Sequence, residues 1–236
     1  MRIGEYATHM DVQRHDGLAY ELMVPQGWPC GRVVVLHGAG SCKENHRDFA
    51  ALCAAGGLAA IVFDQRGHGA SDGALDGRAI EDVATMASLV PGGEDGPLPL
   101  FLRGSSMGGF LALAAAARTG AAGVVAICPA GRELLLGGLR EGRFDFRADR
   151  TALEALVAGQ DLEAAARALG PRLLLVHAEG DDRVPCAGSR RLHAAAPGSR
   201  LVTVPGGDHH SAQHDPALQA AAVEFLAGLT SWPARD

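Results

Sequence analysis

The run Gly104-Ser105-Ser106-Met107-Gly108 is the stretch that decides the fold of this chain. The short apolar segment Leu98–Leu102 precedes it and the Ala- and Leu-rich segment Phe110–Arg118 follows it, which predicts a sharp turn from a buried strand into a helix. A serine at such a turn presents its hydroxyl above the end of the sheet, because the glycines two residues away on either side carry no Cβ atoms that would clash. The N-terminus of the following helix favours a negatively charged oxygen. We therefore interpret Ser106 as a candidate nucleophile.

The length of 236 residues is within the range that α/β folds fill as a single domain, which we expect to span residues 1–236. Hydrophobic residues make up 47% of the chain and charged residues 20%, which is ordinary for an enzyme with one sizeable core. The net charge is −6 and the basic residues form no stripe, so nucleic acid and anionic membranes are not expected as partners.

Cysteine usage and the N-terminal segment predict a cytoplasmic protein. The five cysteines are odd in number and show no C-x-x-C spacing, so reduced thiols are the simplest interpretation. Residues 1–15 contain no apolar core of a secretory signal, and no apolar run approaches the length of a membrane span. The sequence leaves the oligomeric state open.

Beyond the opening segments, short apolar strands alternate with helices. Two weakly alternating segments, Ile3–Val12 and Leu18–Val24, predict an antiparallel hairpin that turns at Asp16-Gly17. The strands expected after it are Val33–Leu36, Ala59–Phe63, Leu98–Leu102, Val124–Ile127, Arg172–His177 and Arg200–Val204. The expected helices are Arg47–Ala55, Ile80–Val90, Met107–Arg118, Gly188–Ala196 and Pro216–Leu229. Continuous apolar strands alternating with helices favour a mainly parallel, doubly wound sheet covered on both faces.

The stretch between Ile127 and Arg172 interrupts this alternation. It predicts a small helical cap insertion over one edge of the sheet, at about residues 131–169. Leu135, Phe144 and Phe146 are candidates to line an apolar substrate pocket and to set a preference for acyl chain length. The alternative is that these apolar residues only pack the insertion onto the sheet.

A serine nucleophile needs a general base and an acid that orients the base. Asp181 follows the strand that ends at His177, and His209 follows the strand that ends at Val204, so both are expected at the same rim of the sheet as Ser106. Asp182 and His210 are the neighbouring alternatives. His210 and His214 also have a spacing that metal ligands use on a helix, but no third ligand is evident.

The proposed chemistry also requires an oxyanion hole, in which two backbone N–H groups point at the developing negative charge. One N–H is expected from Met107, directly after the nucleophile. The other is expected from the Gly-rich run His37-Gly38-Ala39-Gly40. A phosphate-binding loop is the alternative for this run, but the sequence has no G-x-G-x-x-G and no Lys-Ser/Thr after the glycines.

Together these segments resemble the α/β-hydrolase superfamily, in particular its small esterases, dienelactone-hydrolase-like members and serine-aminopeptidase-like members. The resemblance covers most of the chain from about residue 30 onward. Its motifs are Leu36–Gly40, Phe63–Gly73, Gly104–Gly109, His177–Pro185 and Gly206–His209. The resemblance implies that Ser106 is the nucleophile, Asp181 the acid and His209 the base. It also implies that Ala39 supplies an oxyanion amide, and that the Arg66–Gly69 run is a structural loop.

We therefore expect a serine hydrolase that cleaves a small carboxylic ester through an acyl-serine intermediate, without a metal or cofactor. Thioester or amide hydrolysis by the same triad is the nearest alternative. A small-molecule-binding protein without hydrolytic activity is an alternative of another class, although a pure binder needs neither triad nor oxyanion loops.

Overall fold

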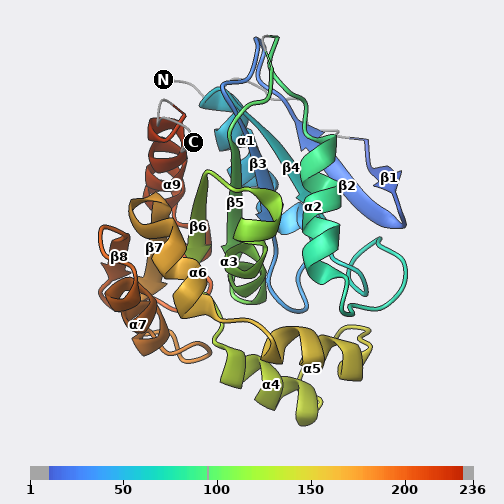
Figure 1. The fold of residues 1–236 in the computed structure, drawn as a ribbon, viewed down its shortest axis with the longest axis vertical. Coiled ribbons are helices and arrows are strands. Elements are labelled where there is room, and N and C mark those ends of the chain that lie inside the picture. Colours follow the sequence, from blue (N-terminus) through green and yellow to red (C-terminus); the bar gives the residue numbers. More distant parts are fainter. Residues whose placement is uncertain (1–10, 95, 231–236) are drawn as a thin grey trace.

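The computed structural model describes residues 11–94 and 96–230, which form an eight-stranded sheet with helices on both faces (Figure 1). The strand order is β1-β2-β4-β3-β5-β6-β7-β8; the strands from β3 to β8 are parallel, and β1 and β2 are antiparallel to their neighbours. The strands are β1 (Gln13–His15), β2 (Leu18–Met23), β3 (Gly31–Leu36), β4 (Leu58–Phe63), β5 (Leu100–Ser105), β6 (Gly123–Ile127), β7 (Leu173–Ala178) and β8 (Arg200–Val204). The mainly parallel α/β architecture predicted from the sequence is confirmed.

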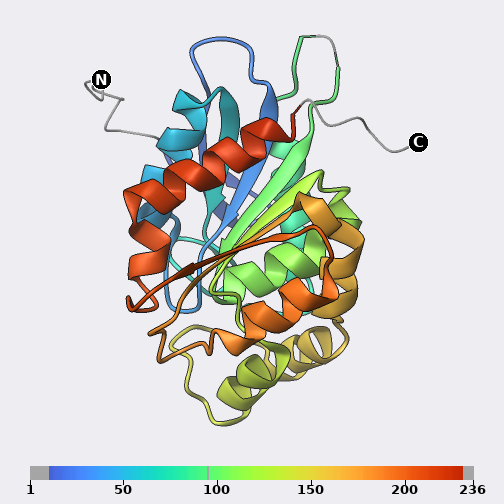
Figure 2. The same ribbon diagram turned by 90° about the vertical axis from the view of Figure 1, so that its left-hand side faces the viewer.

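The helices divide between the two faces of the sheet. The α-helices are α1 (Arg47–Ala55), α2 (Ala79–Leu89), α3 (Met107–Thr119), α4 (Arg132–Arg140), α5 (Arg150–Ala158), α6 (Leu162–Leu169), α7 (Ala187–Ala195), α8 (Ser211–His214) and α9 (Pro216–Gly228). Two short 3-10 helices are η1 (Lys43–His46) and η2 (Gly170–Arg172). Residues of α1, α8 and α9 share one buried apolar cluster with the sheet, and residues of α2, α3, α6 and α7 share the other. Figure 2 shows α9 lying across the first of these faces.

The central strands are buried along their whole length. Every residue of β4, β5, β6 and β7 is buried, which explains why their sequences show continuous apolar runs rather than alternation. The sequence places β5 too early, at Leu98–Leu102, because Arg103, Gly104 and Ser105 are polar or small. The strand in fact continues through these residues and delivers the chain directly to Ser106.

The hairpin turn lies where the sequence predicts it. Asp16 (φ 48°) and Gly17 (φ 75°) both have positive φ, as a two-residue turn of type I′ requires. The strand directly before the turn is β1, at residues 13–15, and residues 11 and 12 of the expected segment Ile3–Val12 are not in a strand. Residues 3–10 of that segment lie outside the described residues.

The insertion between β6 and β7 has two parts. Helix α6 packs against α3 and α7 and so belongs to the layer that covers the sheet. Helices α4 and α5 pack against each other and form the cap, at one end of the molecule in both views (Figures 1 and 2). Backbone hydrogen bonds fasten the cap to the loop after β4, from Leu75 N–H to the Arg147 carbonyl (2.8 Å) and from Asp149 N–H to the Leu75 carbonyl (2.9 Å).

Two further observations concern membrane-spanning helices and the cysteines. The helices within residues 11–94 and 96–230 include none that is both long and apolar enough to span a membrane. The five cysteines all lie in the described ranges, and each is a free thiol there.

Candidate active site

Ser106 occupies a strained corner between β5 and α3. Its backbone has φ 53° and ψ −118°, an uncommon region for a residue with a side chain. The Ser106 N–H donates to the Ile127 carbonyl (2.9 Å), and the Ser106 carbonyl accepts from Ala130 N–H (3.0 Å). Cβ atoms on Gly104 or Gly108 would overlap backbone atoms, so the two glycines of the motif are sterically required. The surrounding packing therefore holds the strained conformation in place.

The side chain of Ser106 is accessible while that of its neighbour is not. Ser105 is fully buried, whereas Ser106 is partly exposed. Within the described part of the chain the Ser106 hydroxyl makes no hydrogen bond. The corner thus presents one free hydroxyl at the rim of the sheet.

Asp181 and His209 form a buried hydrogen-bonded pair at the same rim. The Asp181 carboxylate lies 2.6 Å from Nδ1 of His209. The other carboxylate oxygen accepts from the N–H groups of Arg183 (2.9 Å) and Val184 (2.8 Å). Burial raises the pKa of Asp181, but the Val184 N–H and His209 outweigh it, so the pKa lies below its ordinary value. Because an ionised carboxylate only accepts, Nδ1 of His209 carries the proton, and Nε2 is the ring nitrogen left to act as a base.

The neighbouring alternatives are placed differently. Asp182 and His210 are exposed. The His210 N–H donates to the Asp208 carboxylate (2.9 Å) in a turn at the base of α8. His214 stacks on His46 with ring centroids 5.9 Å apart, and its side chain also faces Asp48. The pair brought together at the strand ends is therefore Asp181 with His209.

Cys128 is a member of this site that the sequence analysis does not identify. It follows β6 directly, has φ 43° and is fully buried, and its thiol hydrogen-bonds Asp181. Burial raises the pKa of this thiol. The only sequence signal is its position one residue after a strand of the parallel sheet.

The ligand atoms of Cys128, Asp181 and His209 lie within 4.8 Å of one another, a spacing that a metal ion can use. However, the His209 proton and the Cys128 thiol are already hydrogen-bonded to the Asp181 carboxylate. A metal ion here would have to replace these protons. The donors are therefore satisfied without an ion.

The loop His37–Gly40 passes directly against the candidate nucleophile. A Cβ atom on Gly38 would lie 3.3 Å from Cβ of Ser106. Nδ1–H of His37 donates to the Gly38 carbonyl (2.7 Å), while Nε2 accepts from Gln65 N–H (3.0 Å). Burial lowers the pKa of His37 to about 4, so the ring is neutral. The Gly38 carbonyl and the Ala39 N–H belong to one peptide unit, so His37 fixes the direction of the Ala39 amide.

The two expected oxyanion donors are both free of other partners. Neither Ala39 N–H nor Met107 N–H donates to a group in residues 11–94 and 96–230. Met107 is the first residue of α3, where N–H groups have no intrahelical acceptor. The two loops that carry these amides flank Ser106.

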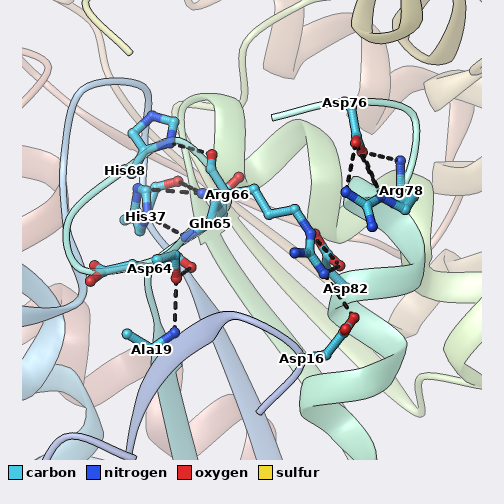
Figure 3. A network of polar contacts seen from close by, with 11 residues as sticks. Asp16, Ala19, His37, Asp64, Gln65, Arg66, His68, Asp76, Arg78 and Asp82 are labelled. Atoms are coloured by element: carbon cyan, nitrogen blue, oxygen red, sulfur yellow. Dashed lines mark hydrogen bonds and ion pairs between the residues drawn. The ribbon is translucent and has the colours of Figure 1, made fainter. Parts of the chain in front are cut away.

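The Arg66–Gly69 loop is held by a polar network (Figure 3). The Arg66 guanidinium binds Asp82 (2.9 Å) and Asp16 (2.8 Å). Nδ1 of His68 faces the Arg66 carbonyl at 3.1 Å. The ring of His68 stacks on Phe146 of the cap with centroids 4.3 Å apart. The loop therefore links the oxyanion loop to the cap.

Two cavities lie beneath and beside the cap. Leu135, Phe144 and Phe146 line one of them together with Met107, and its volume is only about 10 Å³. The other is polar, holds about 310 Å³ and begins at Pro129 and Ala130 beside Ser106. Its charged and amide-bearing walls come from the starts of α4 and α6 and from α7: Arg132, Glu133, Gln160, Asp161, Glu163 and Arg191.

Comparisons with known proteins show what the chain is similar to. Residues 27–135 match the family model described as serine aminopeptidase, S33, and residues 157–236 match the model of TAP-like proteins. The chain is 28% identical to a monoacylglycerol lipase of Mycolicibacterium smegmatis over 265 aligned positions, covering 91% of this chain and 92% of the relative. It is 34% identical to the monoglyceride lipase of Homo sapiens over 116 residues, covering 44% and 37% of the two chains. The structure of a monoacylglycerol lipase from Paleococcus ferrophilus superposes with a TM-score of 0.67 at 20% identity, covering 90% of this chain and 99% of that one.

The chain belongs to the α/β-hydrolase superfamily. The resemblance inferred from the five sequence motifs is thus confirmed, as is the interpretation of the chain as an enzyme of the hydrolase class. In this α/β-hydrolase, Ser106, Asp181 and His209 all follow the C-terminal ends of strands, on β5, β7 and β8 respectively.

Proposed function

We propose that this α/β-hydrolase cleaves carboxylic esters through an acyl-serine intermediate, with Ser106 as nucleophile, His209 as base and Asp181 as the orienting acid. The observation that carries the proposal is the Asp181–His209 hydrogen bond of 2.6 Å at the sheet rim where the strained Ser106 corner presents a free hydroxyl. The lipase relatives support ester hydrolysis as the reaction class.

The proposed reaction begins when Nε2 of His209 takes the proton of the Ser106 hydroxyl. Oγ attacks the ester carbonyl, and the N–H groups of Ala39 and Met107 stabilise the resulting oxyanion, at about 3 kcal/mol for each donor. The imidazolium then returns its proton to the departing alkoxide. Next, His209 removes a proton from water, the hydroxide attacks the acyl-serine, and the acid leaves as Ser106 regains its proton. Asp181 stabilises the imidazolium and keeps Nδ1 protonated.

We further propose that the acyl group is short. The apolar cavity beside Met107 has a volume of only about 10 Å³. A group larger than a methyl therefore does not fit there while the cap is in place. The larger polar cavity starts at Ala130 and suits an alcohol portion that carries hydroxyl groups. These two cavities support an ester with a small acyl group and a polar alcohol.

The proposal is tested with Ser106→Ala and the matched control Ser105→Ala. Ser105 is the adjacent serine, and its buried hydroxyl has no hydrogen-bond partner in the described residues, so its removal should leave folding and activity intact. Removal of a triad nucleophile costs on the order of 10⁴- to 10⁶-fold in kcat. We expect only Ser106→Ala to lose hydrolysis of p-nitrophenyl esters and labelling by a fluorophosphonate probe. If folded Ser106→Ala keeps more than a tenth of the activity, Ser106 is not the nucleophile.

Competing substrates are distinguished with one panel. The wild-type enzyme is assayed with p-nitrophenyl esters of graded chain length, acyl-CoA thioesters and aminoacyl-nitroanilides. We expect the highest kcat/KM for acetyl and propionyl esters. A preference for thioesters or anilides would correct the substrate class. Absence of both turnover and probe labelling would indicate a binding protein.

A further inference from the structure

Arg103 is a buried cation close to the candidate nucleophile. It lies on β5, three residues before Ser106, and its side chain is fully buried on the sheet face that α1, α8 and α9 cover. The guanidinium carbon lies 4.8 Å from the centroid of the Phe49 ring. Within the described ranges Arg103 forms no ion pair with a carboxylate. The Asp48 carboxylate attracts the guanidinium without pairing with it, and burial still lowers the pKa of Arg103.

The burial of Arg103 does not favour the stability of the fold. Burial of a charge without a directly paired counterion is unfavourable, and an apolar residue of similar size would pack at lower cost. Nη1 of Arg103 donates to Nδ1 of His46 (2.9 Å), so the His46 ring accepts and is neutral. Nε of Arg103 has no partner in the described residues. Arg103 therefore needs an explanation other than packing.

The remaining contacts of Arg103 lead to the candidate base. Nη2 of Arg103 donates to the main-chain carbonyl of Gln213 in α8 (3.3 Å). The Gln213 side-chain amide donates to the main-chain carbonyl of His209 (2.7 Å). The Gln219 side-chain amide also donates to the Gln213 carbonyl (3.1 Å). Two hydrogen bonds thus connect the strand that delivers Ser106 to the residue that faces Asp181.

We propose that Arg103 is a positioning residue for His209. Through Gln213 it ties the loop between β8 and α9 to β5, and so fixes the place of the His209 ring relative to Ser106. This inference rests on the proposed function, because it assumes that His209 acts on Ser106. Arg103 itself touches neither substrate nor the reacting atoms.

The expected kinetic effect follows from this geometry. A displacement of about 1 Å between reacting groups can cost on the order of 100-fold in rate. The Arg103 network lies on the sheet face of α1, α8 and α9, whereas the cap and its cavities adjoin the opposite apolar cluster. We therefore expect Arg103→Met to lower kcat about 10- to 100-fold with little change in KM.

The experiment compares Arg103→Met, Gln213→Met and the double variant with a matched control, Arg32→Met. Arg32 also donates to a main-chain carbonyl, that of Leu98 (3.1 Å), but lies near the start of β3, at the opposite end of the parallel strands. The readouts are kcat, KM and the rate at which a fluorophosphonate modifies Ser106, each beside the unfolding midpoint. We expect both single variants and the double variant to share one loss in kcat and in modification rate, because they break one connection. Arg32→Met should change only the midpoint.

Failure of this inference differs from failure of the proposed function. If the probe does not modify Ser106 in the wild-type enzyme, the proposed function fails. If the probe does modify wild-type Ser106, two results would show that the positioning role is wrong. One is that folded Arg103→Met is modified at the wild-type rate, and the other is that the losses in kcat of the two single variants multiply in the double variant. If Arg103→Met does not fold, Gln213→Met and Arg103→Lys are measured instead. The lysine variant should have an intermediate modification rate, because it keeps the positive charge but lacks the planar set of N–H donors.

Discussion

Gly180 and Gly207 lie so close together that no side chain fits between them. A Cβ atom on Gly180 would overlap the carbonyl oxygen of Gly207, and Gly180 N–H donates to the Gly206 carbonyl (3.1 Å). These glycines belong to the loops that carry Asp181 and His209. Backbone contact between the two loops therefore sets the separation of Asp181 and His209.

This contact predicts that Gly180→Ala reduces activity. The new methyl group must push the two loops apart, because the atom that it meets is backbone and cannot rotate away. We expect kcat to fall at least tenfold while the cap-side cavities are unchanged. Gly228→Ala is the control, since a Cβ atom there meets nothing within 4 Å, and it should leave kcat unchanged. A wild-type rate for Gly180→Ala would show that the pair tolerates displacement.

Alanine substitutions at Asp181, Asp182, His209 and His210 separate the candidate acid and base from their neighbours. We expect His209→Ala and Asp181→Ala to lose on the order of 10⁴-fold in kcat or more. The exposed neighbours Asp182 and His210 should retain nearly full activity. All four proteins are assayed with one ester, and a larger loss at Asp182 or His210 would move the assignment by one residue.

Much of this site is predictable from sequence because its members follow apolar strands. Ser106, Asp181 and His209 each stand just after a strand whose apolar run marks the sheet, so their shared rim follows from parallel topology alone. Arg103 and Gln213 carry no such signal, because Arg103 lies within β5 and Gln213 within α8, and Cys128 follows β6 but shows nothing in sequence that places its thiol beside Asp181. Their partners lie in distant parts of the chain, and only the folded packing brings them into hydrogen-bond distance. The division of the insertion into a cap and a covering helix, α6, likewise depends on tertiary packing.

The cap aromatics predict a change in chain-length preference. Phe144 fills space against Gly138 and lines the small cavity that also reaches Met107. We expect Phe144→Ala to enlarge this cavity and to raise kcat/KM for butyryl and hexanoyl esters relative to acetyl esters several-fold. It should also destabilise the fold, but by less than the roughly 3 kcal/mol that loss of a fully buried ring costs, because Phe144 is only partly buried. Equal effects on all chain lengths would mean that the cavity does not receive the acyl group.

Stability should fall as the pH drops from about 6.5 to about 4. The pKa of His37 is lowered from 6.5 to about 4 in the folded protein, so between these values the unfolded chain binds more protons than the folded one. The contribution of this residue is complete above pH 6.5 and lost toward pH 4, by about 3 kcal/mol. Urea unfolding at pH 7, 6, 5 and 4.5 measures it.

The variant His37→Gln tests whether His37 causes this dependence of stability on pH. We expect its free energy of unfolding to depend less steeply on pH than that of the wild type, whatever its stability at pH 7. His210→Gln, at an exposed histidine, is the control and should keep the wild-type slope. Parallel slopes for His37→Gln and the wild type would indicate that His37 does not titrate in this window.

Metal removal is expected to have no effect on hydrolysis. The donors of Cys128, Asp181 and His209 are satisfied by one another, and the proposed chemistry draws its nucleophile, base and oxyanion donors from the chain. Dialysis against EDTA should leave kcat unchanged. A loss that zinc restores would instead assign an ion to this cluster.

The distribution of the site over β5, β7 and β8 has a consequence for biosynthesis. A growing polypeptide exposes Ser106 long before the segment that contains His209 has been translated. In the proposed mechanism the serine then has no base, so we expect a nascent or truncated chain not to hydrolyse esters. We expect hydrolysis only after β8 has paired with β7, so that turnover reports completed folding of the whole sheet.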